Sequence, residues 1–221
     1  MTKRVAAVPK TVNLYVLAVV HACLIASACT QGGNKDEDKQ PPASLTVSTS
    51  TEAAPLNFEQ AAKRDDVVRL SPNAFGDLPA PVKGELKRRG CTIPQVYFPQ
   101  NPSNVVKGHF TTPSQIDIAA LCSVEGVSSI LVFRNGSPSD VSELASAPDL
   151  NFLQEVGDGK IGYSRGLGVA DSGYIQQHFE ALGGPKPPPV NHEGINDIFV
   201  EKASRVWYWY DGNWLELTGA D

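Results

Sequence analysis

The segment Gly162-Tyr163-Ser164-Arg165-Gly166 matches the G-x-S-x-G pattern that carries the nucleophilic serine of many hydrolases. Such a serine needs a histidine to accept its proton, and His178 and His192 follow it in the chain. The motif also needs a strand before the serine and a helix after it. Leu167-Gly168-Val169-Ala170 is a poor helix start, and the chain is short for a hydrolase with a parallel sheet. We favour a glycine-rich strand or loop, with a serine hydrolase using Ser164 as the alternative.

The four cysteines fall into two groups with different predicted roles. Cys23 lies within an apolar N-terminal run and Cys29 follows that run closely, which leaves Cys91 and Cys122 in the folded part. Outside the reducing cytosol, such a pair most simply forms a disulfide. Two buried free thiols or a metal pair are the alternatives, although no C-x-x-C spacing or clustered histidines favour a metal.

The N-terminus has the pattern of an export signal. Three cations and no acid precede an apolar run of 12 residues over positions 14–25, and Ala26-Ser27-Ala28 supplies the small residues that a signal peptidase requires. The apolar run is shorter than the roughly 17–25 residues of a membrane-spanning helix. Residues 1–28 are therefore predicted to be a removable signal peptide.

Residues 24–29 (LIASAC) resemble the bacterial lipobox, in which small residues precede an invariant cysteine that receives diacylglycerol. The segment departs from the usual pattern by having Ala26 where leucine is common. The resemblance implies a lipid on Cys29 that holds the chain to a membrane, and Thr30 implies sorting to the outer membrane or cell surface. Ordinary cleavage after Ala28, with release of a periplasmic or secreted protein, is the alternative.

Charge excludes one class of partner. The whole chain carries −5, and loss of the signal leaves 16 basic against 24 acidic residues, a net charge of −8. The basic cluster Lys87-Arg88-Arg89 stands at the end of a predicted helix, where cations favour the negative end of the helix dipole. Nucleic-acid binding depends on many cationic contacts to phosphate, so a nucleic-acid partner is not expected.

Composition divides the mature chain into a tether and one domain. Residues 29–65 are rich in glycine, proline, serine, threonine and charge, which predicts a flexible linker. Residues 66–221 are long enough for one domain with its own core. An apolar pattern with a glycine stop predicts helices over residues 78–89 and 172–182, the latter capped by Ser172. A short helix is also expected near residues 140–145.

Strand patterns dominate the rest of the domain. They predict strands over residues 105–110, 117–122, 129–133, 160–163, 199–200, 205–210 and 213–217. Glu125-Gly126, Asn135-Gly136 and Asp211-Gly212 are predicted tight turns, because these residue pairs tolerate positive φ. The expected fold class is α+β, mainly antiparallel sheet with two or three short helices.

The C-terminal hairpin gathers the aromatic residues. With Asp211-Gly212 as its two-residue loop, strand alternation places four residues on one face: Trp207, Trp209, Trp214 and Glu216. Aromatic side chains so arranged can bind sugar rings or a partner protein. The alternative is that a packed element, such as the helix over residues 172–182, covers this face.

Two stretches resemble the FG-GAP repeat of integrin-type β-propellers, in which a strand runs through Gly-x-Phe into an acidic turn and a second strand. The first contains Gly108-His109-Phe110 and Asp117, and the second runs from Asn191 to Val200. The chain is too short for the several blades that close a propeller. Residues 90–95 and the hairpin also resemble those of uncharacterised exported bacterial proteins, which implies no activity.

In the repeat family the acidic turn binds calcium. The first copy here keeps Asp117 as its one carboxylate, whereas the second keeps Asn191, Glu193 and Asp197. Calcium takes six to eight oxygen ligands, so a site with two carboxylates would be weak. The alternative is a turn between strands in which Asp197 accepts local backbone N–H groups. No cofactor is expected beyond this weak calcium site.

The sequence therefore predicts an exported envelope lipoprotein that acts as a binding or structural module rather than an enzyme. Its expected partners are the membrane, through the lipid on Cys29, and an envelope protein or polysaccharide.

Overall fold

The computed structural model describes residues 57–58, 67–97 and 100–221, all within one unit that spans Thr51–Asp221. The predicted signal peptide, Cys29 and almost all of the predicted tether lie outside the described residues. Among the described residues, no helix is long and apolar enough to cross a membrane.

Two four-stranded antiparallel sheets form the body of the domain. The first has the order β3 (Val105–Gly108), β4 (Asp117–Val124), β5 (Val127–Phe133) and β6 (Val141–Pro148). The second has the order β12 (Asn213–Thr218), β11 (Ala203–Tyr210), β10 (Gly194–Phe199) and β9 (Arg165–Ala170). This arrangement confirms the prediction of a mainly antiparallel fold.

Smaller elements lie before, within and between these sheets along the chain. The described residues contain two short ladders, β1 (Arg69–Leu70) with β2 (Ile93–Pro94) and β7 (Leu153–Glu155) with β8 (Ile161–Tyr163). Three 3-10 turns are η1 (Pro72–Ala74), η2 (Arg134–Gly136) and η3 (Asp149–Phe152).

Helix α2 (Ala80–Arg88) forms where the sequence predicts it. Val82 and Leu86, one turn apart, are its buried residues, and Gly90 ends the helix region with a φ of +76°. Arg88 and Arg89 donate hydrogen bonds to Glu85, and these bonds lower the pKa of the Glu85 carboxyl to about 2. The basic cluster therefore stabilises the last helical turn, as its position predicts.

Helix α3 (Ser172–Leu182) is also where the sequence predicts it, but its cap is different. The N-cap is Asp171, whose carboxylate accepts a 2.7 Å hydrogen bond from the Tyr174 N–H. Asp171 has the extended backbone that an N-cap requires, whereas Ser172 is already helical. The predicted Ser172 cap was wrong by one residue. The Asp171 cap holds the backbone of Tyr174 in the first turn of the helix.

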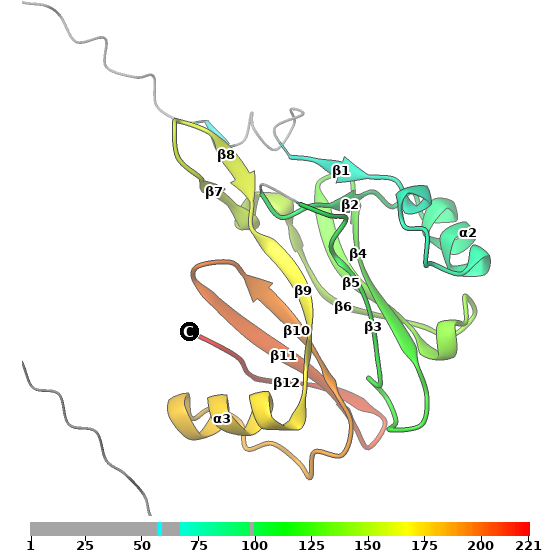
Figure 1. Cartoon of the computed structure of the whole chain (residues 1–221), viewed down its shortest axis with the longest axis vertical. Helices are drawn as coiled ribbons and strands as arrows, with labels where there is room; N and C mark the ends of the chain where they lie inside the picture. The colour runs from blue at the N-terminus through cyan, green and yellow to red at the C-terminus, as the bar shows by residue number, and fades with distance from the viewer. Residues whose placement is uncertain (1–56, 59–66, 98–99) are drawn as a thin grey trace, which may run out of the picture. The chain divides into compact units, whose positions relative to one another are not determined.

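The elements stack in four layers (Figure 1): α2, the β3–β6 sheet, the β9–β12 sheet and α3. Strand alternation produces this order, since Ala119 and Leu121 point to the space between the sheets while Ile118 and Ala120 point to α2. The second sheet has the same alternation, with Val206, Tyr208 and Leu217 toward α3.

The predicted helix near residues 140–145 is wrong, because this segment forms β6. It pairs with the apolar edge of β5, where Ile130 lies opposite Leu144 and Leu131 opposite Glu143. Tertiary pairing therefore overrides a weak local helix tendency. A register shift follows between Ser128 and Ile130, and Ala145 has a φ of +51°, the signature of a β-bulge.

The predicted hairpin register is confirmed residue for residue. Trp209 lies opposite Trp214 and Trp207 opposite Glu216. The loop residues Asp211 and Gly212 both have positive φ, at 48° and 79°. This is the conformation of the two-residue turns whose twist matches that of the flanking strands.

The predicted disulfide is confirmed between Cys91 and Cys122, with a Cα–Cα distance of 5.0 Å. Cys122 lies in β4 on the face toward α2, and Cys91 follows the end of that helix. The bond therefore joins the end of α2 to the sheet that it covers.

Candidate functional site

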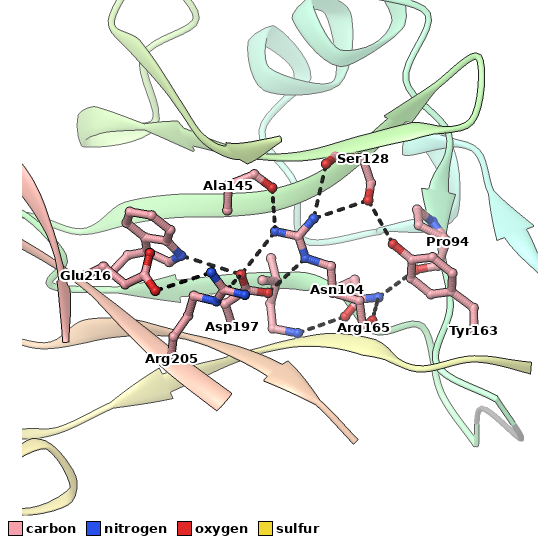
Figure 2. Close-up of polar contacts among 11 residues, drawn as sticks. Pro94, Asn104, Ser128, Ala145, Tyr163, Arg165, Asp197, Arg205 and Glu216 are labelled. Carbon is pink, nitrogen blue, oxygen red and sulfur yellow. Dashed lines mark hydrogen bonds and ion pairs between the residues drawn. The ribbon is translucent and has the colours of Figure 1, made fainter. Parts of the chain in front are cut away.

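A buried ion pair occupies the space between the two sheets (Figure 2). The Arg165 side chain is 1% exposed and that of Asp197 is 6% exposed. Arg165 Nε donates to Asp197 Oδ1 at 2.8 Å, and Nη2 donates to Oδ2 at 3.1 Å. This bidentate geometry is the strong form of the arginine–carboxylate pair.

Arg165 also connects the sheets across the β-bulge. Its Nη1 donates to the Ser128 carbonyl at 3.1 Å, and its Nη2 donates to the Ala145 carbonyl at 2.9 Å. Both carbonyls lie where the β5–β6 register shifts, so the bulge frees acceptors that the ladder would otherwise use. The guanidinium provides five donors in a plane, which allows one side chain to bond the carboxylate and both carbonyls.

The network continues toward solvent on one side. Arg205 Nε lies 3.9 Å from Asp197 Oδ2, and Arg205 Nη1 donates to Glu216 at 3.3 Å. Trp207 Nε1 donates a long 3.5 Å hydrogen bond to Asp197 Oδ2. Positive and negative side chains thus alternate from the interior to the surface, and their formal charges sum to zero. In order they are Arg165, Asp197, Arg205 and Glu216.

Asn104 bonds to the backbone of β2 and β9 at the point where β3 lies beside β9. Its amide nitrogen donates to the carbonyls of Pro94 and Arg165, and its amide oxygen accepts from the Leu167 N–H. With a φ of 68°, Asn104 has the left-handed backbone that asparagine tolerates better than most residues. The Asn104 side-chain amide therefore fixes the backbone of Arg165, whereas Asp197 fixes the side chain of Arg165.

These contacts give the ion pair a structural role. Each Asp197 oxygen already accepts from Arg165, and the guanidinium is fully surrounded by acceptors. A group that exchanged protons with a substrate would need to reach that substrate, whereas these two side chains are only 1% and 6% exposed. The arrangement instead fixes the register of one sheet on the other.

Tyr163 gives this interior a measurable pH dependence. Burial, and then the nearby Asp149 carboxylate, raise the pKa of the Tyr163 phenol above its usual value of 10.0. A raised pKa means that Tyr163 contributes stability fully below pH 10, and that this contribution is lost as the pH rises further. We expect the free energy of unfolding to fall above pH 10, with this residue contributing up to about 1.4 kcal/mol per pH unit.

Urea unfolding between pH 8 and 11.5 tests this expectation. Tyr163→Phe should flatten the alkaline fall, at a cost of about 1 kcal/mol at neutral pH for the lost hydrogen bond with Ser128. Tyr210→Phe is the matched control, because Tyr210 is 44% exposed. Equal alkaline slopes for the wild type and Tyr163→Phe would contradict the assignment.

Ser164 does not lie in the structural setting of a nucleophile. It stands between β8 and β9, with a strand rather than a helix after it. Its side chain is fully buried, and its hydroxyl donates a 2.6 Å hydrogen bond to the Phe152 carbonyl. The glycine-rich strand that we favoured over the hydrolase motif is what forms here, as β9.

His178 and His192 have other neighbours. The His178 ring lies 4.2 Å from the Tyr174 ring on α3, and the His192 ring stacks on Tyr208 at 4.3 Å. Both His192 ring nitrogens lie within hydrogen-bond distance of backbone carbonyls, those of Glu193 and Trp209. Neither imidazole is bonded to Ser164.

The three predicted calcium ligands have separate partners. The Tyr208 hydroxyl donates to Asn191 Oδ1 at 3.5 Å, Glu193 accepts a 2.7 Å bond from the His109 N–H, and Asp197 pairs with Arg165. The expected turn was wrong for Asp197, because β10 begins at Gly194 and makes Asp197 a mid-strand residue. Within the described residues, no group of three or more His, Cys, Asp or Glu side chains is placed to hold a metal.

In the first FG-GAP-like stretch, Asp117 is also used internally. Its carboxylate is fully buried and accepts from the Thr111 N–H and hydroxyl, the Gln115 amide and the Asn135 N–H. This carboxylate therefore organises the turns before β4 and after β5.

The tryptophan face points into the sandwich. Trp207 and Trp214 pack against the cluster between the sheets, and Trp209 meets Trp214 edge-to-face at 5.4 Å. The Arg134 guanidinium lies 5.0 Å from the Trp209 ring centroid. The covering element is thus the β3–β6 sheet, whereas α3 lies on the opposite face. All three indoles are half-buried, and their use as a binding surface stays a prediction.

A separate polar cluster, which no sequence pattern predicted, lies on the outer face of the β9–β12 sheet. It consists of Tyr174, Asn196 and Ser204, which line a groove of about 400 Å³ beside α3. Asn196 is 8% exposed, and its Oδ1 is buried without a hydrogen-bond partner. Strand alternation could have separated Asn196 from Asp197, but only after β10 was recognised as a strand.

The comparisons add no family to this description, since no family model, no curated protein and no solved structure matches the chain.

Proposed function

We propose that this chain is an exported protein of the bacterial cell envelope, anchored by a lipid on Cys29, whose domain is a binding or structural module. The single observation that carries the compartment is the Cys91–Cys122 disulfide. Such bonds form and persist outside the reducing cytosol. The signal-like N-terminus over residues 1–28 and the lipobox resemblance at Cys29 supply the route and the anchor.

The contacts of the buried polar residues support a module without catalytic chemistry. Arg165, Asp197 and Asp117 are used to join strands and turns, and the Ser164 hydroxyl is bonded to backbone. Catalytic groups in contrast keep a free position toward a substrate and are commonly shifted in pKa within a cleft. A half-buried aromatic face and an outer groove remain as surfaces for an envelope protein or polysaccharide.

Metabolic labelling with a clickable fatty acid tests the anchor. In a bacterial host, we expect the wild-type protein to carry the label in the membrane fraction, and Cys29→Ser to lose both the label and the membrane association. Cys23→Ser is the matched control, because this cysteine lies within the predicted signal and should leave labelling unchanged. An unlabelled wild-type protein released in soluble form would establish the alternative, cleavage by the ordinary signal peptidase.

A further inference from the structure

The outer groove is built by three elements that meet at one face of the second sheet. Tyr174 comes from the first turn of α3, Asn196 from β10 and Ser204 from β11, and Ala220, which follows β12, also lines the groove. The Asp171 cap positions Tyr174 through its backbone N–H. The groove is therefore held by a helix start and by neighbouring strands rather than by a free loop.

Hydrogen bonds join these groups into one cluster. Asn196 Nδ2 donates to the Tyr174 hydroxyl at 3.1 Å, and the Tyr174 and Ser204 hydroxyls lie 2.9 Å apart. The Ala220 N–H donates to Ser204 Oγ at 2.8 Å and contacts the Tyr174 oxygen at 3.2 Å. Only one of the two hydroxyl protons is used between Tyr174 and Ser204, so the pair has one donor to spare.

The cluster also has one polar atom to spare on Asn196. Its Oδ1 is buried with no hydrogen-bond partner, and an amide turned the other way would leave Nδ2 in that position instead. A buried polar atom without a partner destabilises the folded state. A ligand that reached this atom by shifting the side chains around it would supply a bond that the free protein lacks.

We propose that this groove binds a carbohydrate, with neighbouring hydroxyls of one sugar bonding Asn196 and the Tyr174–Ser204 pair. A hydroxyl both donates and accepts, so two adjacent hydroxyls satisfy the amide and the spare donor together. Ile198, two residues after Asn196 on β10, also lines the groove and offers apolar contact to the carbon skeleton of a sugar.

A peptide fits the same geometry less well. Extended peptides are recognised mainly through the backbone groups of a sheet edge. Here the spare groups are side-chain atoms on a sheet face, and β10, which carries Asn196, is hydrogen-bonded on both sides by β9 and β11. The proposal rests on the proposed function, since it names envelope polysaccharide as the class that the binding module recognises.

Nuclear magnetic resonance titration tests the groove on the full exported chain carrying Cys29→Ser. The probes are neutral oligosaccharides of glucose, galactose and N-acetylglucosamine, each at up to 10 mM, and a blocked trialanine peptide as the other class. We expect at least one sugar to shift the Asn196 side-chain amide together with the backbone amide of Gly168, whose position packs against Asn196. The peptide should leave both signals unchanged.

Variants separate this site from other surfaces. Tyr174→Phe and Ser204→Ala should each weaken sugar binding about tenfold, the effect of one lost hydrogen bond. Tyr210→Phe and Ser139→Ala, at exposed positions, are the matched controls and should bind like the parent.

Three results would overturn the proposal: no shift with any sugar, a shift with the peptide alone, or a sugar shift confined to the Trp209 and Trp214 indoles. In each case, retained fatty-acid labelling at Cys29 would leave the proposed envelope function standing. Loss of labelling with groove binding intact would overturn the anchor alone.

Discussion

Replacing Arg165 by methionine is expected to lower the free energy of unfolding by about 3–5 kcal/mol. The change leaves the Asp197 carboxylate, 6% exposed, without its bidentate partner between the sheets. It also removes the donors to the Ser128 and Ala145 carbonyls at the β-bulge. Urea unfolding followed by circular dichroism at pH 7 measures the loss.

The matched control for this prediction is Arg205→Met. Arg205 lies 3.9 Å from the same Asp197 carboxylate, but its side chain is 49% exposed. Exposed ion pairs contribute about 0–1 kcal/mol, so this variant should remain within that range of the wild type. Equal losses for the two arginine variants would show that burial does not determine the effect.

A double variant separates the charge from the packing. Arg165→Met with Asp197→Leu removes both buried charges, and replacing a whole buried pair by apolar residues is often close to neutral. We expect the double variant to recover at least half of the stability that Arg165→Met loses. The pair would not be coupled if the double variant lost as much stability as Arg165→Met alone and Asp197→Leu alone lose in sum.

The second large effect is expected from removing the Cys91–Cys122 bond, which should lower the free energy of unfolding by about 3–4 kcal/mol. The two cysteines are 31 residues apart, and the bond restricts the unfolded chain by closing that loop. For a domain of this size, the loss corresponds to a fall of roughly 6–16 °C in the melting temperature. Scanning calorimetry with and without a phosphine reductant measures it.

The control is Cys91→Ala with Cys122→Ala. Both cysteines are almost fully buried, so alanine introduces no polar group into the layer beneath α2. The double variant should melt near the reduced wild type and should not respond to the reductant. A wild-type melting temperature that is unchanged by complete reduction would contradict a stabilising disulfide.

Local sequence determined the elements whose signals lie within a few residues. The Asp211-Gly212 loop sets the register of the final hairpin, because a two-residue turn permits one pairing. Val82, Leu86 and Gly90 define α2 by spacing and by a residue that tolerates positive φ. The two cysteines within residues 66–221 sufficed to predict their bond.

Tertiary structure decided the elements whose partners are distant in sequence. Residues 141–148 became a strand because β5 offered an open edge, which no local pattern reveals. Asp197 became the central partner of Arg165 because β10 pairs on both sides, although its spacing from Asn191 and Glu193 suggested a calcium turn. Local residues thus determined the turns and helix ends, whereas the packing of the layers determined which polar side chains came into contact.

The same division applies to the candidate sites. Strand alternation correctly placed Trp207, Trp209 and Trp214 on one face, but only the packing of two sheets showed that this face points inward. The Asn196 groove needs α3, β10 and β11 to converge. Hydrogen bonds between residues 22 and 30 positions apart join these elements, those of Tyr174 with Asn196 and with Ser204. Sequence alone determined which residues could do chemistry, and long-range packing decided which remained free to do it.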